Sequence, residues 1–345
     1  MPGLSRDLIE GRHVSYQHLI SLKSRDYSNF EVLIVGAGWM AGQYAEALKK
    51  LGVRRFGMVC RSEATAGRCR ERYGIEAVPG GFERGLRQLG GFDLTIVALP
   101  IHELVTAAEA AIECGHRNIL VEKPGALTRG PLAELQGRAD AARARVRVAY
   151  NRLAYPNLWQ LKSLVAAEGG ATSCRYTFTE LVRAMDFDKE RPEVYQRWGI
   201  ANSLHVIAMA HDLIGPPENL TALQQGSLPW HRSGDRFVGA GKTRAGVPFS
   251  YHADWSSGGR WGIEVMTAEN AYRLMPLEDL YRCPRGSFDW APVGFETPFP
   301  GVKPGVAEQT AVMLAPDVEA HVPLVALQRA MDFITLAEKI LGYED

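Results

Sequence analysis

The sequence predicts an α/β protein in which a doubly wound parallel sheet is followed by an α+β domain with an open, largely antiparallel sheet. Three observations predict this fold class. Short, fully apolar segments alternate with helical patterns up to residue 152. A glycine-rich turn follows the first apolar segment. Beyond residue 152 the apolar residues recur with a period of two. Buried parallel strands read as continuous apolar runs, whereas half-buried antiparallel strands alternate.

The first domain is expected to span residues 31–152, after an N-terminal extension of residues 1–30 that is helical near 16–22. Each apolar run is short enough for a strand, and each following segment is long enough for a crossover helix. The expected strands lie at 32–35, 55–60, 94–99, 118–121 and 146–150, and the expected helices at 43–51, 63–73, 104–114 and 132–142.

The second domain is expected to span residues 153–345, and its last helix is expected to pack back on the first domain. An open sheet leaves one face that needs a cover, so we expect a homo-oligomer, a dimer or tetramer, formed through this face. Expected helices lie at 158–167, 204–214 and about 324–341, a polar loop at 186–196, and strands at 173–179, 236–242, 248–255, 262–267 and 271–274.

Composition limits the kinds of partner. The chain has 345 residues, 39 basic and 39 acidic side chains, and 46% hydrophobic residues. Balanced charge argues against nucleic acid or an anionic membrane, since both select a basic face. No apolar run approaches the ~20 residues that span a bilayer, and residues 1–30 lack the apolar core of a signal peptide. Five scattered cysteines without a Cys-x-x-Cys pair predict no disulfide framework and no metal site, as in a cytoplasmic protein.

The glycine-rich turn predicts a dinucleotide site in a Rossmann domain. Gly36, Gly38 and Ala41 fit the Gly-x-Gly-x-x-Ala pattern between a strand and a helix, with Trp39 and Met40 between them. The first glycine permits the tight turn, the second lets the backbone approach the pyrophosphate, and the alanine allows close helix–strand packing. The helix N-terminus then faces the phosphates. The alternative is a glycine turn without a ligand.

The end of the second strand bears on the choice between NAD and NADP. A carboxylate is expected there for the ribose hydroxyls of NAD, but the strand ends in Cys60, Arg61 and Ser62. Arg61 could face a 2′-phosphate with Ser62 donating a hydrogen bond, which favours NADP over NAD. The alternative is that Arg61 points to solvent and Glu63 binds the ribose.

Two further strand ends should meet the nicotinamide. Leu99 and Pro100 close one strand and are expected to shape the cofactor site. Glu122 and Lys123 end the next strand, immediately before Pro124. Hydride transfer to or from a carbinol carbon requires a proton acceptor or donor at its oxygen, and Lys123 is our candidate. Glu122 points to the opposite face of the strand, so a structural hydrogen bond is expected for it. The alternative for Lys123 is a surface lysine.

Four motifs occur in an order that resembles a known family. They are the glycine turn, residues 98–100 (Ala-Leu-Pro), residues 122–124 (Glu-Lys-Pro) and residues 150–152 (Tyr-Asn-Arg). Over residues 30–341 the chain is similar to the Gfo/Idh/MocA family of glucose–fructose oxidoreductases and inositol dehydrogenases. The resemblance implies NAD(P)-dependent oxidation or reduction of a sugar, sugar-nucleotide or cyclitol alcohol, and it assigns the family lysine to Lys123.

The family's second-domain motif, Asp-x-Gly-x-His-x-x-Asp, is only partly present. His205 matches the family histidine, and a glycine follows ten residues later, as the family spacing requires. Ala201 and Ala208 replace the two aspartates, with Asn202 and Ser203 as polar neighbours that could substitute. The resemblance implies that His205 orients the substrate hydroxyl or shares its proton.

The remaining substrate candidates are polar residues at strand ends and in one loop. Asn151 and Arg152 could hold sugar hydroxyls or a phosphate, or could instead join the two domains. Glu180 ends a strand of the second domain and could touch the substrate. Arg197 and Trp198 suit a loop over a phosphorylated or nucleotide-bearing sugar, although polar loops are usually only solvated.

Two classes of function are compatible with these residues. The first is an NAD(P)-dependent oxidoreductase that acts on a CH–OH group of a small carbohydrate with Lys123 as acid/base. The second is a catalytically inactive dinucleotide-sensing regulatory or binding protein, motivated by Ala201 and Ala208. A cyclic imine or a diol is a further substrate possibility. The sequence does not specify the sugar, the carbon or the physiological direction.

Overall fold

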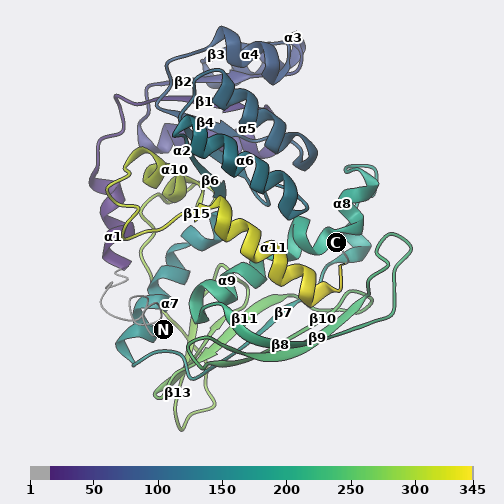
Figure 1. The fold of residues 1–345 in the computed structure, drawn as a ribbon. Helices are drawn as coiled ribbons and strands as arrows, with labels where there is room; N and C mark the ends of the chain where they lie inside the picture. Colours follow the sequence, from purple (N-terminus) through teal and green to yellow (C-terminus); the bar gives the residue numbers. More distant parts are fainter. Residues whose placement is uncertain (1–15, 344–345) are drawn as a thin grey trace.

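The computed structural model describes residues 16–343 and contains two sheets, with the blue N-terminal part above the green second sheet in Figure 1. The first sheet has strand order β15-β6-β5-β4-β1-β2-β3, and β1 to β6 are parallel. The second sheet has order β14-β13-β12-β11-β7-β10-β9-β8 and is mainly antiparallel. The expected fold class is therefore confirmed.

The strands of the first sheet are apolar because helices cover both faces. In β1, Val32 to Val35 are fully buried. The strands are β1 (Glu31–Val35), β2 (Arg55–Val59), β3 (Glu76–Val78), β4 (Leu94–Val97), β5 (Asn118–Glu122), β6 (Arg145–Ala149) and β15 (Val325–Ala326). The helices are α2 (Trp39–Leu51), α3 (Glu63–Tyr73), α4 (Gly81–Gln88), η2 (Ile101–Glu103), α5 (Leu104–Glu113) and α6 (Arg129–Ala142). The expected strands at 32–35, 55–60, 94–99, 118–121 and 146–150 are all present.

The second sheet buries one face under helices and leaves the other open. Helix α9 packs on β7 and β11, and α11 packs on β8 and β9. Its strands are β7 (Ser173–Phe178), β8 (Pro217–Gln225), β9 (Arg236–Thr243), β10 (Pro248–Asp254), β11 (Trp261–Met266), β12 (Asn270–Leu274), β13 (Tyr281–Pro284) and β14 (Ala291–Pro292). The other helices are α1 (Tyr16–Ser21), η1 (Leu22–Ser24), η3 (Asn151–Ala154), α7 (Pro156–Ala167), η4 (Val182–Ala184), α8 (Pro192–Gln196), the π-helical turn η5 (Gly199–Ser203), α9 (Leu204–Ile214), α10 (Val306–Leu314) and α11 (Leu327–Leu341).

The open face carries an apolar pair at its edge. Leu223 of β8 and Val238 of β9 lie opposite each other in register, and they are 64% and 44% exposed. Around the centre of the same face, Arg175 of β7 forms an ion pair with Glu264 of β11 at 2.7 Å. Assembly through this face stays a prediction.

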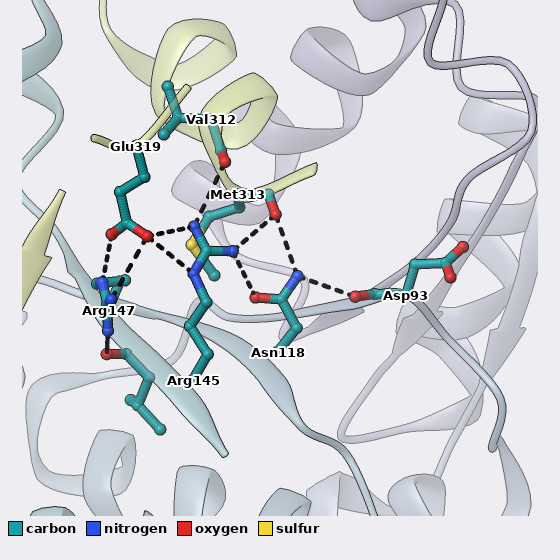
Figure 2. A network of polar contacts seen from close by, with 8 residues as sticks. Asp93, Asn118, Arg145, Arg147, Val312, Met313 and Glu319 are labelled. Carbon is teal, nitrogen blue, oxygen red and sulfur yellow. Dashed lines mark hydrogen bonds and ion pairs between the residues drawn. The ribbon is translucent and has the colours of Figure 1, made fainter. Parts of the chain in front are cut away.

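The C-terminal residues return to the first sheet, as expected for the last helix. Helix α10 packs on α2, β15 pairs antiparallel with β6, and α11 lies between α6 and α9 (Figure 1). Figure 2 shows the polar contacts that hold this C-terminal segment against the first sheet. Glu319 accepts hydrogen bonds from Arg145 at 2.8 Å and Arg147 at 2.5 Å, and Arg145 also donates to the Met313 carbonyl at 2.9 Å and to Asn118 Oδ1 at 3.0 Å.

Several expectations for the elements need correction. The second sheet is not a simple antiparallel meander, because β7 and β10 are parallel at its centre. The expected loop at 186–196 ends in α8, where Pro192 occupies the first helical turn. The last helix begins at Leu327 rather than near 324, since Val325 and Ala326 are paired with β6. Elements β3, α4, β8, α10, β13, β14 and β15 were not expected from the sequence.

The expected domain limits at residues 30 and 152 stay a prediction, and residues 1–15 of the extension lie outside the described residues. Within residues 16–343, no helix combines the length and the apolarity that crossing a bilayer requires.

Candidate active site

The glycine turn connects β1 to α2, and its two glycines have different surroundings. Gly36 has φ +125°, and a Cβ at this position would lie 2.2 Å from the Ala98 carbonyl oxygen. Gly38 is the N-cap of α2, and a Cβ there would meet nothing within 4 Å. Ala41 is fully buried under the turn. The turn is thus tight against β4 and open above the helix N-terminus, where backbone N–H groups favour an anion.

A cavity of about 870 Å³ lies above this turn at the C-terminal ends of the parallel strands. This edge is where open α/β sheets bind ligands. Of the predicted site residues, the wall includes Gly36, Gly38, Trp39, Met40, Arg61, Ser62, Leu99, Pro100, Glu122, Lys123 and Asn202. The residues of the wall that we did not predict as cofactor or substrate ligands include Thr65, Gly80, Gly81, Phe82, Glu83, Glu103, Glu190, Val194 and Ala201.

The end of β2 presents a cation and no carboxylate to the cavity. The Arg61 side chain is 80% exposed, and its guanidinium lies 3.6 Å from Glu103. The Ser62 hydroxyl caps α3 by accepting from the Thr65 backbone N–H at 3.3 Å. Glu63 pairs with Arg70 and is absent from the cavity wall. The geometry therefore does not favour Glu63 as the ribose ligand.

Lys123 lies where β5 ends, at the opposite end of the cavity from Arg61. Its Nζ donates to the Ala201 carbonyl oxygen at 2.6 Å. Burial lowers the pKa of Lys123 to about 8; the charges of Arg152 and Lys303 act in the same direction, and those of Glu122 and Glu180 oppose it. A buried amine with such a pKa can exchange a proton near neutral pH.

Glu122 is adjacent to Lys123 but belongs to a separate buried network. The Tyr44 hydroxyl donates to Glu122 Oε1 at 2.5 Å, and Gln309 of α10 donates to the Tyr44 hydroxyl oxygen at 2.9 Å. Burial raises the pKa of Glu122. This hydrogen bond ties β5 to α2, which agrees with the structural role that the side-chain direction predicts.

His205 lies in the first turn of α9 and is buried. Its Nδ1 has no hydrogen-bond partner among residues 16–343. Burial lowers the pKa of His205 well below its usual value, and the nearby charges of Lys123, Arg152 and Lys303 lower it further. Burial and these charges therefore favour the neutral form of the imidazole.

Glu180 provides a carboxyl group beside the segment in which the family aspartate is replaced by Ala201. It accepts from Ser203 Oγ at 2.5 Å and from Asn202 Nδ2 at 2.8 Å. Burial raises the pKa of Glu180. These bonds fix the π-helical turn η5, whose Ala201 carbonyl holds the ammonium of Lys123.

Asn151 and Arg152 lie outside the cavity wall and connect β6 to loops of the second domain. Asn151 donates to the Pro304 carbonyl at 3.1 Å. Arg152 donates to Glu278 at 3.0 Å, and its guanidinium stands over the rings of Tyr155 and Trp261 at 5.5 and 5.1 Å. The Asn151 contact fits the domain-joining alternative, whereas Arg152 also lies near His205.

Among the other loop candidates, Arg197 is engaged away from the cavity. It donates to the Leu127 carbonyl at 3.0 Å and pairs with Glu338 of α11. Trp198 lies in the cavity wall. The site also contains Lys303, which sequence reasoning missed because it lies in a Pro- and Gly-rich stretch without a regular pattern.

The parallel sheet, the glycine turn and the cavity above it together have the form of a dinucleotide-binding Rossmann domain. Residues 30–150 match the family model described as "Oxidoreductase family, NAD-binding Rossmann fold" (Gfo/Idh/MocA). This match confirms the resemblance to the family that the four motifs indicate. No curated protein sequence matches the chain.

Solved structures share the whole two-domain fold at low sequence identity. UDP-N-acetylglucosamine 3-dehydrogenase GnnA from Acidithiobacillus ferrooxidans has a TM-score of 0.70 at 15% identity over 91% of this chain and 97% of its own. A putative NADPH-dependent oxidoreductase from Desulfitobacterium hafniense has a TM-score of 0.74 at 14% identity, over 92% and 95%. A levoglucosan dehydrogenase complex with NADH has a TM-score of 0.71 at 17% identity, over 91% and 96%.

Proposed function

We propose that the protein moves a hydride between the nicotinamide of NADP or NAD and a carbinol carbon of a sugar, sugar nucleotide or cyclitol. One observation carries this proposal. The buried amine of Lys123 lies in the wall of the same cavity as the dinucleotide turn. Two of the similar folds are sugar dehydrogenases by name, UDP-N-acetylglucosamine 3-dehydrogenase and levoglucosan dehydrogenase, which supports a carbohydrate substrate.

The residues present fit a dinucleotide. The space above Gly38 is open, and the N-terminus of α2 has no side-chain cap, so its N–H groups are available to a pyrophosphate. Leu99 and Pro100 lie in the wall between this turn and Lys123. When bound, the nicotinamide would supply the hydride donor or acceptor.

Lys123 and His205 would manage the proton at the substrate oxygen. In alcohol oxidation the neutral amine of Lys123 accepts the hydroxyl proton, and in ketone reduction the ammonium donates one. The Ala201 carbonyl holds the ammonium form through its hydrogen bond to Nζ. The imidazole of His205, whose buried Nδ1 has no hydrogen-bond partner among residues 16–343, would orient the same oxygen.

The direct test is a panel of sugars and keto-sugars with oxidised or reduced cofactor, followed by the absorbance of the reduced nicotinamide. Turnover of any member supports the oxidoreductase proposal. Binding of the cofactor without turnover of any member would favour the dinucleotide-sensing alternative. The buried Lys123 amine, which donates to the Ala201 carbonyl, argues for the oxidoreductase, because a dinucleotide sensor has no need of a buried amine with a lowered pKa.

The pH profile should report the pKa of Lys123, which is about 8. Alcohol oxidation needs the neutral amine, so its kcat/KM is expected to rise as the pH increases through about 8 and then level off. Ketone reduction needs the ammonium, so its kcat/KM should fall over the same interval. Rate profiles in both directions check this. Inflections that persist in a Lys123→Met variant with residual activity would assign them to another group.

Arg61 should determine the preference for NADP. Arg61 lies in the cavity wall just beyond the end of β2, 3.6 Å from Glu103, and neither of its neighbours in the chain is acidic. Arg61→Ala is expected to weaken NADP⁺ binding about tenfold or more, since a charge-assisted contact is lost, and to change NAD⁺ binding less than about twofold. Titration of both cofactors measures this. Arg55→Ala, at the other end of β2, is the control. An equal loss for both cofactors would contradict a 2′-phosphate contact.

A further inference from the structure

Three cations from different parts of the chain gather around His205. Lys123 comes from the end of β5, Arg152 from η3, and Lys303 from the loop that precedes α10. All three contribute by charge to the lowered pKa of the His205 imidazole. Like charges repel, so their convergence requires either carboxylate partners or an anionic ligand.

The carboxyl groups near these cations are already engaged. Glu122 accepts from Tyr44, and Glu180 accepts from Asn202 and Ser203. Burial raises the pKa of both carboxyl groups, so the low dielectric of the site disfavours their negative charges. Among residues 16–343, the half-exposed Glu278 is the single acid that pairs directly with one of the three cations, Arg152.

Lys303, like Lys123, has no ion-pair partner among residues 16–343. It is partly buried, and among residues 16–343 no carboxylate lies within 4.0 Å of its ammonium group. Its Nζ stands 4.9 Å from the ring centre of Trp39, which is 68% exposed beside the glycine turn. The hydrogen bond from Asn151 to the Pro304 carbonyl fixes the adjacent backbone. Lys303 therefore lies beside the glycine turn, near enough to Lys123 and His205 for its charge to lower the pKa of both.

The guanidinium of Arg152 is held in a defined orientation and keeps N–H groups that could donate to a ligand. The rings of Tyr155 and Trp261 hold its guanidinium, and one nitrogen donates to Glu278. A guanidinium has five N–H donors. Trp261 also lies 6.2 Å from the His205 ring, so Arg152 and His205 share one aromatic neighbour. The unpartnered Nδ1 of His205 is a further polar atom that is buried at this place.

We propose that the substrate carries an anionic group, a carboxylate or a phosphate, which Arg152 and Lys303 bind beside His205. The substrate would then be an acidic sugar or cyclitol derivative rather than a neutral one. This inference rests on the proposed function, because it concerns the substrate of the same site. Lys123 remains available for the reacting oxygen, and the other two cations neutralise the anionic substituent.

The first experiment measures anion binding without turnover. Malonate is titrated into the protein saturated with NADP⁺ at constant ionic strength, and the fluorescence of tryptophan is followed. We expect saturable binding that Lys303→Gln weakens about tenfold or more, because a charge-assisted hydrogen bond is lost, and that Lys303→Arg largely retains. Lys242→Gln, which removes a half-exposed lysine paired with Glu218 on the second sheet, is the matched control and should bind malonate normally.

Malonate titrations with and without NADP⁺ show whether these cations bind a substrate anion or the phosphates of the cofactor. If malonate binds only without NADP⁺ and the cofactor displaces it, the cations hold cofactor phosphates and the substrate inference is wrong. Absence of saturable malonate binding in both states would also overturn it. Neither result affects the proposed hydride transfer, which the sugar panel tests independently.

The second experiment compares substrates in matched pairs. Glucose is assayed against glucuronate and glucose 6-phosphate, and galactose against galacturonate, in both wild-type protein and Lys303→Gln. A kcat/KM for an acidic member about tenfold above that of its neutral partner, lost in Lys303→Gln, supports the proposal. The acidic sugar with the higher kcat/KM, glucuronate or glucose 6-phosphate, identifies the anionic group as a carboxylate or a phosphate. Equal or better turnover of the neutral partner overturns the anionic substrate while leaving the oxidoreductase in place.

Discussion

Replacement of Lys123 by Met is expected to lower kcat/KM by about 10²–10⁴-fold, the usual contribution of a positioned acid or base. Methionine keeps most of the length of the side chain and tolerates burial, so the fold should persist. The substitution removes the amine that donates to the Ala201 carbonyl and that we propose as the acid or base. Steady-state rates measure the loss.

Cofactor affinity distinguishes a chemical role of Lys123 from a binding role. The dissociation constant of the cofactor is expected to change less than about twofold in Lys123→Met, because the glycine turn and α2 are unaltered. Lys242→Met, on the second sheet away from the cavity, should retain both rate and affinity. Turnover of Lys123→Met at the wild-type rate would reject the acid/base assignment.

Substitution of Gly36 by Ala is expected to destabilise the protein by about 3 kcal/mol or more, even without cofactor. The new Cβ would lie 2.2 Å from the Ala98 carbonyl oxygen, and φ +125° is a conformation that alanine avoids. Either β1 must move away from β4 or the turn must change its conformation. Urea unfolding of the cofactor-free protein measures the effect.

Gly38→Ala is the matched variant, because its Cβ would enter open space. We expect its stability without cofactor to change by less than about 0.5 kcal/mol, as for a surface substitution. Its cofactor affinity should fall about tenfold or more, since the methyl group occupies the approach of the pyrophosphate. If Gly36→Ala were as stable as Gly38→Ala, the steric argument for the turn would fail.

The dinucleotide half of the site could be predicted because its information is local. Gly36, Gly38 and the apolar runs on either side each follow from a strand–turn–helix pattern within a few residues. Parallel strands also bring their C-terminal ends to one edge, so Lys123 and Arg61 could be placed at the same cavity from their positions alone.

The substrate half could be predicted only in part because it depends on contacts between distant segments. The position of His205 followed from a motif, but the hydrogen bonds of Glu180 to Asn202 and Ser203 join segments with no common pattern. Lys303 reaches the site from an irregular loop whose place depends on the bond from Asn151 to the Pro304 carbonyl. No periodicity in the sequence encodes either contact.

The same distinction explains the missed elements. β3 has three residues, too few for an alternation to be recognised. α4 contains Gly81 and Gly85, which lower helix propensity, yet a Cβ on Gly85 would lie 2.4 Å from Val59 Cγ1. Close packing against β2 therefore outweighs propensity there. β15 has two residues and is a strand only because β6 offers it an edge.

The return of the chain to β6 has a consequence for biosynthesis. Arg145 and its partner Glu319 are 174 residues apart, and β15 follows Glu319. A ribosome therefore delivers β1 to β6 long before the segment that pairs with β6. During that interval the backbone of β6 is an unpaired edge, which invites wrong partners and attracts chaperones. We therefore expect this edge of the first sheet to be covered only once the ribosome has released the far end of the polypeptide.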